Sequence, residues 1–221
     1  MWLDRLEKAV SIPIVRAQKG NIIQDLLTAP KGRFVSVPFF LKHADGSQGM
    51  GRRQCTREYK IDVVQKAIRL RLGYEPRKRV KHQVNVNIGI SIDEASRMKP
   101  SQVGWMTNVF PLIELGLSRA DCQKYVEATG LGKAPKSACY ICPYRSNEGW
   151  KQLHDEEPET FKKAVDFDVA LRQGGTAACN KGMNAQQYLH RNLVPLSELP
   201  FTKDSRQLDL FDNECEGMCG L

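Results

Sequence analysis

The chain has 221 residues, of which 41% are hydrophobic and 26% charged, the ordinary composition of a globular protein with a core of its own. No apolar run approaches 18 residues, so the sequence predicts no membrane-spanning helix. The net charge of +8 is uneven: residues 1–82 carry +11 and residues 83–221 carry −3. The first part therefore suits an anionic partner, either a nucleotide or a nucleic acid, or forms a solvated basic surface.

The sequence predicts alternating helices and strands. In chain order we expect a helix at 1–10, a short strand at 12–17, a helical turn at 21–27, an edge or irregular strand at 33–41, a loop at 44–51, a helix at 58–72, a strand at 83–91, a strand or extended segment at 110–116, and helices at 117–130 and 158–174. This alternation indicates the α/β class.

Local signals support several of these elements. Ser118 and Asp121 have the spacing of a helix capping box. Pro38 has no backbone N–H to donate to a neighbouring strand, so we expect its segment to be an edge strand or irregular. In 83–91 apolar residues alternate with asparagines, which is unusual for a fully buried parallel strand. The alternation predicts a strand near a sheet edge or beside a wet site.

Seven cysteines are present, and the charged N-terminus lacks the apolar core of a secretory signal. We therefore expect a reducing, cytoplasmic location, where closely spaced cysteines point to metal or redox chemistry rather than to disulfides. Cys139 and Cys142 form a C-x-x-C pair, whose gap lets one turn aim both sulfurs at one point, and Pro143 helps to fix that turn. The pair suits half a zinc site, a redox pair or part of an iron–sulfur site.

Cys55 lies in the basic stretch "GRRQCTREYK". Cationic neighbours favour the thiolate, so Cys55 is a candidate nucleophile or metal ligand, against the alternative of a buried thiol beside a solvated patch. Cys122 is interpreted as a core residue of a helix and Cys179 as a spare loop thiol. Cys215 and Cys219 form C-x3-C in a glycine-containing tail, which is either a reactive or metal-capturing end or an exposed tail.

Four segments together resemble the phosphoadenosine phosphosulfate reductase family of the adenine-nucleotide α-hydrolase (PP-loop) superfamily, especially its reductase-like phage and bacterial proteins. They are "CTREYKIDVV" (55–64), "IGISIDEASRMKPS" (88–101), "CYICPYR" (139–145) and "NECEGMCGL" (213–221). The resemblance implies a Rossmann-like sheet and a [4Fe–4S] cluster, or alternatively zinc, with Cys55, Cys139, Cys142 and Cys215 as ligands. It also implies a catalytic tail cysteine, Cys219 or Cys215.

The chain also departs from the family pattern. Thr56 stands where a second adjacent cysteine is expected, and Glu216 is inserted in the tail motif. No glycine- and serine-rich PP-loop, which would cradle phosphates, occurs near the start. We therefore expect an incomplete α/β nucleotide-hydrolase-like domain at 1–130, lacking the first βαβ unit, and a cysteine-rich region at 131–221. A homodimer or a separately encoded N-terminal half would complete it.

Two classes of function follow. The first is sulfur transfer or sulfonucleotide chemistry, with an adenine nucleotide or other anion held by Arg52, Arg53, Arg57, Lys60 and Arg97. The second is a non-catalytic, metal-stapled module whose basic first third binds nucleic acid or a protein partner. Adenine-nucleotide binding with turnover discriminates between them.

Overall fold

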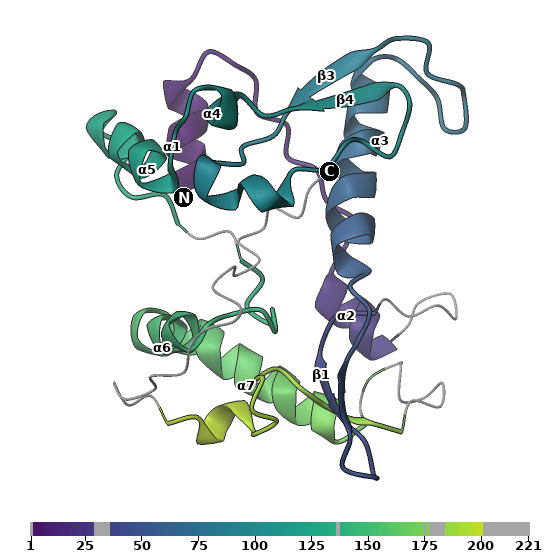
Figure 1. The fold of residues 1–221 in the computed structure, drawn as a ribbon, viewed down its shortest axis with the longest axis vertical. Helices are drawn as coiled ribbons and strands as arrows, with labels where there is room; N and C mark the ends of the chain where they lie inside the picture. Colours follow the sequence, from purple (N-terminus) through teal and green to yellow (C-terminus); the bar gives the residue numbers. More distant parts are fainter. Residues whose placement is uncertain (1, 29–35, 136–137, 175, 177–183, 201–221) are drawn as a thin grey trace. The chain divides into compact units, whose positions relative to one another are not determined.

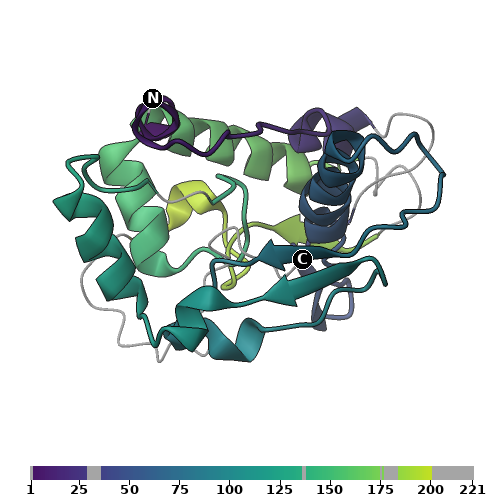
Figure 2. The same cartoon turned by 90° about the horizontal axis from the view of Figure 1, so that it is seen from above.

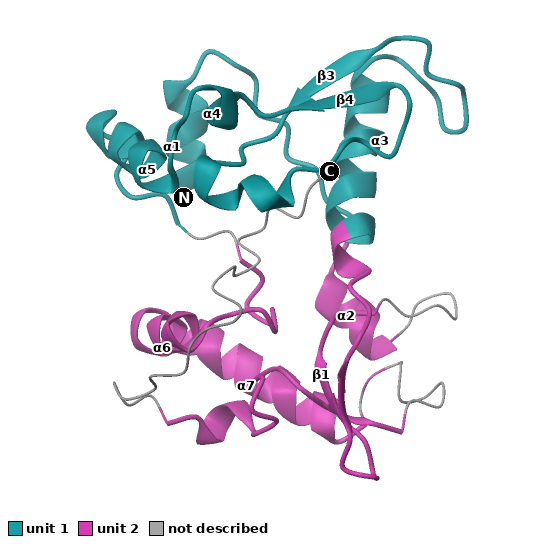
Figure 3. Cartoon of the chain, viewed as in Figure 1, with its two compact units in different colours: residues 1–19, 57–137, 216–221 teal, residues 20–56, 138–215 magenta. Residues whose placement is uncertain are grey.

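The computed structural model describes residues 2–28, 36–135, 138–174, 176 and 184–200, and these form two compact units (Figure 3). Unit 1 contains the described residues of 1–19 and 57–137, and unit 2 those of 20–56 and 138–200. Both units combine helices with a small sheet, so the chain belongs to the α/β class. None of the described helices has both the length and the apolar character that crossing a membrane requires.

Unit 1 is built mainly from helices around one parallel strand pair. Its elements are α1 (Trp2–Ala9), the π-helical turn η2 (Arg57–Ile61), α3 (Asp62–Arg71), β3 (Val84–Asn87), the 3-10 helix η3 (Ile92–Arg97), β4 (Met106–Val109), α4 (Pro111–Glu114) and α5 (Arg119–Ala128).

The strands β3 and β4 run parallel, from the pair Val84 and Met106 to the pair Asn87 and Val109 (Figure 1 and Figure 2). Along β3 the valines are half-buried and the asparagines exposed. Within the described residues β3 has one strand neighbour, so the prediction of a strand near a sheet edge is confirmed.

Helix ends in unit 1 follow the local signals of the sequence. Ser118 and Asp121 cap α5 reciprocally, as predicted, and Gly130 beyond its end has a φ of 78°. Gly73 ends α3 in the same way, with a φ of 77°. Near the start of η2, the Lys19 Nζ lies 2.9 Å from the Oε2 of the buried Glu58, which ties the segment after α1 to this turn.

Unit 2 is an antiparallel sheet packed against helices. Its elements are α2 (Ile22–Thr28), β1 (Phe40–Lys42), β2 (Gln48–Met50), α6 (Asn147–Glu156), α7 (Pro158–Arg172), β5 (Gln186–Tyr188) and the 3-10 helix η5 (Leu196–Glu198). The strand order is β2–β1–β5, and Phe40 pairs with Met50 on one side and with Tyr188 on the other. The helix α7 contacts α6, β5 and η5.

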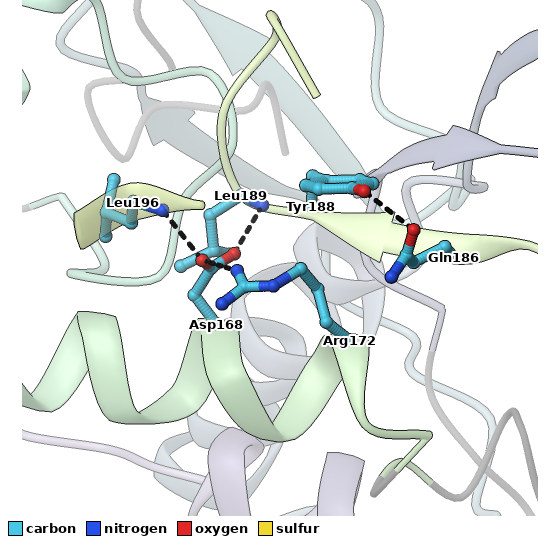
Figure 4. Close-up of polar contacts among 6 residues, drawn as sticks. All are labelled: Asp168, Arg172, Gln186, Tyr188, Leu189 and Leu196. Atoms are coloured by element: carbon cyan, nitrogen blue, oxygen red, sulfur yellow. Dashed lines mark hydrogen bonds and ion pairs between the residues drawn. The ribbon is translucent and has the colours of Figure 1, made fainter. Parts of the chain in front are cut away.

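The hydrophobic core of unit 2 gathers residues from both chain segments. The rings of Phe39, before β1, and Phe167, on α7, lie 5.9 Å apart, and Trp150 of α6 is fully buried. Asp168 of α7 is 1% exposed and accepts hydrogen bonds from the backbone N–H groups of Leu189 and Leu196 (Figure 4). The same carboxylate pairs with Arg172, so one side chain joins three segments of the unit.

Some sequence-based expectations were wrong. Residues 12–17 form no strand, because Ile12 and Val15 remain exposed and gain neither pairing nor burial. The segment 110–116 contains the helix α4 rather than a strand, with Pro111 at its first position, where a missing N–H costs nothing. The chain also divides differently from the expected boundary at residue 130, because residues 20–56 pack with the C-terminal segment in unit 2.

Candidate functional site

The C-x-x-C pair lies on a tight turn at the surface of the unit 2 core. The backbone N–H of Cys142 donates to the carbonyl of Cys139 at 3.0 Å, which closes the turn. Ile141, between the two cysteines, is 1% exposed and belongs to the core. Cys139 is exposed and Cys142 half-buried. The buried isoleucine therefore anchors a turn that carries both thiols near the surface.

Tyr140 reports on the electrostatics of this turn. It packs against the core, and burial raises the pKa of its hydroxyl. The negative charge of the neighbouring Cys139 raises that pKa further, since two anions at close range disfavour each other.

Cys55 is positioned by the chain that leads up to it. The Gly51 N–H donates to the Phe39 carbonyl at 2.9 Å, and the Gln54 N–H donates to the Ser36 carbonyl at 3.0 Å. A Cβ atom on Gly51 would lie 2.5 Å from the carbonyl oxygen of Val37, so only glycine fits there without a backbone shift. Held in this way, the half-buried Cys55 packs against the unit 2 core.

The three cysteines predicted as ligands thus belong to one unit, and thiols are the donors that zinc and iron–sulfur clusters prefer. Within the described ranges, however, no three Cys, His, Asp or Glu side chains form a group suited to a metal ion. Cys215, the fourth predicted ligand, and Cys219, the second predicted tail nucleophile, lie outside the described residues, as does Cys179.

Arg145, three residues after Cys142, was not singled out from the sequence. It is 9% exposed, and its guanidinium lies 5.3 Å from the ring centre of Trp150. Its Nη1 and Nη2 donate to the carbonyls of Gly149 and Cys139 at 3.4 and 3.5 Å, while its Nε has no hydrogen-bond partner among the described residues. The available sequence signal was its place in the same short motif as the cysteine pair.

The five cations predicted to bind an anion are divided between the units. Arg52 and Arg53 lie exposed in unit 2, where the Arg53 guanidinium is 5.0 Å from the ring centre of Tyr144. The other three, Arg57, Lys60 and Arg97, belong to unit 1.

Two of the unit 1 cations already contact carboxylates. Arg97 forms an ion pair with Glu94, and both side chains are largely buried. The exposed Arg57 lies 3.8 Å from Asp62 and donates to Gln102 at 3.3 Å. The charge of Arg97 is therefore balanced within η3.

His190 is a buried histidine, 2% exposed. Its Nε2 lies 2.8 Å from the Asn147 side-chain oxygen, and its Nδ1 accepts from the backbone N–H of Asn192. Burial, followed by the charge of Arg191, lowers its pKa to about 4. His190 is therefore a neutral, hydrogen-bonded residue at neutral pH.

Cys122 was interpreted as a core residue, and this was wrong: it is half-buried on α5, a helix that buries no side chain. It belongs to unit 1, whereas Cys55, Cys139 and Cys142 belong to unit 2.

Comparison of the chain with family models, curated proteins and solved structures finds no match.

Proposed function

We propose that the chain is a phosphoadenosine phosphosulfate reductase-like protein of sulfur-transfer or sulfonucleotide chemistry. In this proposal Cys55, Cys139 and Cys142 hold an iron–sulfur cluster or zinc, Cys215 is the fourth ligand, and Cys219 or Cys215 is the sulfur nucleophile. A cysteine-ligated cluster would serve as a carrier of electrons or sulfur. The observation that carries the proposal is the C-x-x-C turn, anchored by buried Ile141 in the unit to which Cys55 also belongs.

The finer fold assignment belongs to the same proposal. A Rossmann-like sheet without its first βαβ unit is supported by the parallel pairing of β3 and β4, because parallel neighbours require a crossover connection. Within unit 1, Asp93 holds the start of α5 by accepting from the Arg119 N–H at 2.6 Å. The contact places the Asp93 carboxylate at the N-terminal end of α5.

The test is the metal content of the purified full-length chain. The double variant Cys139→Ser/Cys142→Ser removes both thiols of the turn, and Cys122→Ser in unit 1 is the matched control. We expect iron or zinc in the wild type and in the control, and loss of most of it in the double variant. Equal metal content in all three proteins, with folding preserved, would refute the proposed site.

A second candidate function, nucleic-acid binding, is favoured by a cationic surface on unit 1. Six exposed side chains, here called the basic patch, lie on α3 and the connection after it: Lys66, Arg71, Arg77, Lys78, Arg79 and Lys81. None of them forms an ion pair within the described part of the chain. Closely spaced cations without carboxylate partners are suited to successive phosphates.

The connection that carries much of the patch is held in a defined shape. The Arg69 Nη2 donates to the carbonyls of Glu75 and Lys78 at 3.1 and 2.6 Å. The Tyr74 hydroxyl lies 2.7 Å from His82 Nδ1 and accepts from the Lys81 N–H, which joins the two ends. A surface fixed in advance loses less conformational entropy on binding.

Fluorescence anisotropy with labelled single-stranded and duplex oligonucleotides tests this candidate. Arg77→Gln/Arg79→Gln should weaken binding and lower the salt slope of log Kd by about 1 to 2. Lys162→Gln/Lys163→Gln removes the same charge from exposed positions of α7 and should change neither. Equal effects of the two double variants would mean that only net charge matters, and would exclude the basic patch as the site.

A further inference from the structure

Arg145 carries a buried positive charge that nothing in the described structure neutralises. It is 9% exposed and forms no ion pair with any described carboxylate. A buried charge is costly unless it is paired and hydrogen-bonded. The two hydrogen bonds that its terminal nitrogens donate, at 3.4 and 3.5 Å, are at the long limit for such contacts.

Unused hydrogen-bond donors gather in the same corner of unit 2. A guanidinium has five N–H donors, and the Nε of Arg145 is buried without a partner among the described residues. The Trp150 ring lies against that guanidinium, and its indole Nε1 is a second buried donor without a hydrogen-bond partner among the described residues. Two buried donors on side chains that contact each other, neither with an acceptor among the described residues, indicate an environment suited to negative charge.

The C-x-x-C turn, which Arg145 contacts, can supply negative charge through its thiols. Arg145 spans that turn: its backbone N–H donates to the Cys142 carbonyl at 3.2 Å, and its Nη2 donates to the Cys139 carbonyl. Cysteines bind metals as thiolates, and a metal with three or four thiolates carries a net negative charge. Hydrogen bonds and charges around the sulfurs then tune the affinity and properties of the site.

We propose that Arg145 is a positioning residue that compensates the negative charge of a thiolate centre built on Cys139 and Cys142. The inference rests on the proposed metal site and adds a residue that is not itself a ligand. It explains why an arginine is buried beside the turn although no described carboxylate accompanies it.

Two variants of Arg145 separate this role from a merely structural one. Arg145→Met removes the charge and fills a similar volume, whereas Arg145→Lys keeps the charge but loses the planar fork. Replacing an unpaired buried charge by an apolar side chain should leave the metal-free protein as stable as the wild type or more so. Removing the compensating charge should weaken metal binding by about 10- to 100-fold.

The experiment measures zinc affinity of the reduced full-length chain by competition with a chromophoric chelator, and the thermal midpoint of the metal-free protein. We expect Arg145→Met to lose affinity without a lower midpoint, and Arg145→Lys to retain an intermediate affinity. Lys163→Met, an exposed change on α7, is the control and should match the wild type.

Three results would overturn the inference. Unchanged zinc affinity in Arg145→Met would show that its charge is not used. A lower midpoint together with lower affinity would make Arg145 a structural support of the turn. A wild type whose zinc binding is absent, or is unaffected by Cys139→Ser/Cys142→Ser, would refute the proposed metal site and this inference with it, whereas the first two results leave that site standing.

Discussion

Replacing Asp168 by alanine should destabilise unit 2 more than any exposed substitution. The carboxylate is 1% exposed and accepts from the N–H groups of Leu189 at 3.2 Å and Leu196 at 2.8 Å (Figure 4). Its loss leaves two buried N–H donors without partners, at about 1–3 kcal/mol each. It also leaves Arg172, whose side chain is 16% exposed, without its counter-ion.

These contributions give an expected loss of about 3–5 kcal/mol for Asp168→Ala, in line with the removal of one partner from a buried ion pair. Asp168→Asn keeps one acceptor oxygen and should lose roughly half as much, about 2 kcal/mol. Asp166→Ala, an exposed position two residues earlier on α7, is the matched control and should change stability by less than about 0.5 kcal/mol.

Urea unfolding followed by tryptophan fluorescence provides the assay. In a background with Trp2 and Trp105 replaced by phenylalanine, the signal comes from Trp150, which is buried in the core of unit 2. The reasoning is refuted if Asp168→Ala and Asp166→Ala unfold at the same urea concentration with the same slope. An unchanged slope with a shifted midpoint would locate the effect in the folded state.

Two further predictions concern unit 2. Gly51→Ala should lower the free energy of unfolding by about 1–3 kcal/mol through overpacking, because its Cβ would lie 2.5 Å from the Val37 carbonyl oxygen. Gly49→Ala in β2 is the control and should be tolerated, because its Cβ meets no atom closer than 3.6 Å. Equal urea midpoints of the two variants would contradict this prediction. His190, whose pKa burial lowers to about 4, should make stability fall as the pH drops from about 6.5 to 4, because the unfolded chain takes up the proton first. In His190→Gln the pH dependence over this window should be flatter, and an unchanged profile would show that other groups cause it.

Elements with strong local signals were predictable from the sequence. The capping box of Ser118 and Asp121 places α5, and glycines at positive φ end α3 and α5. Pro38 is excluded from β1, which begins two residues later at Phe40. These features depend on neighbouring residues and on the fixed geometry of proline and glycine, so a short window of sequence contains the necessary information.

Features that depend on distant residues were not predictable. The strand β5 is three residues long and exists because Gln187 and its neighbours pair with β1, far away in the sequence. The segment 12–17 has strand-like composition but no strand partner in the described structure. Strand propensity reflects packing against neighbours, so composition alone does not decide these cases.

In the candidate site, too, features set by neighbouring residues were predictable from the sequence and features set by distant residues were not. Spacing identified Cys139 and Cys142 as a pair on one turn, which the structure bears out. The burial of Arg145 and the close approach at Gly51 required three-dimensional coordinates, because both depend on chain segments that lie far apart in the sequence or on core packing.

The discontinuous construction of unit 2 has a consequence for its synthesis. The partners Phe40 in β1 and Tyr188 in β5 are 148 positions apart, and the whole of 57–135 lies between the two halves of the unit. At translation rates of about 5–20 residues per second, β1 waits roughly 7–30 s for its partner strand to be made. During this interval the hairpin and the apolar side chain of Phe39 lack their final cover, so the ribosome-bound chain passes through a stage exposed to aggregation and to chaperones.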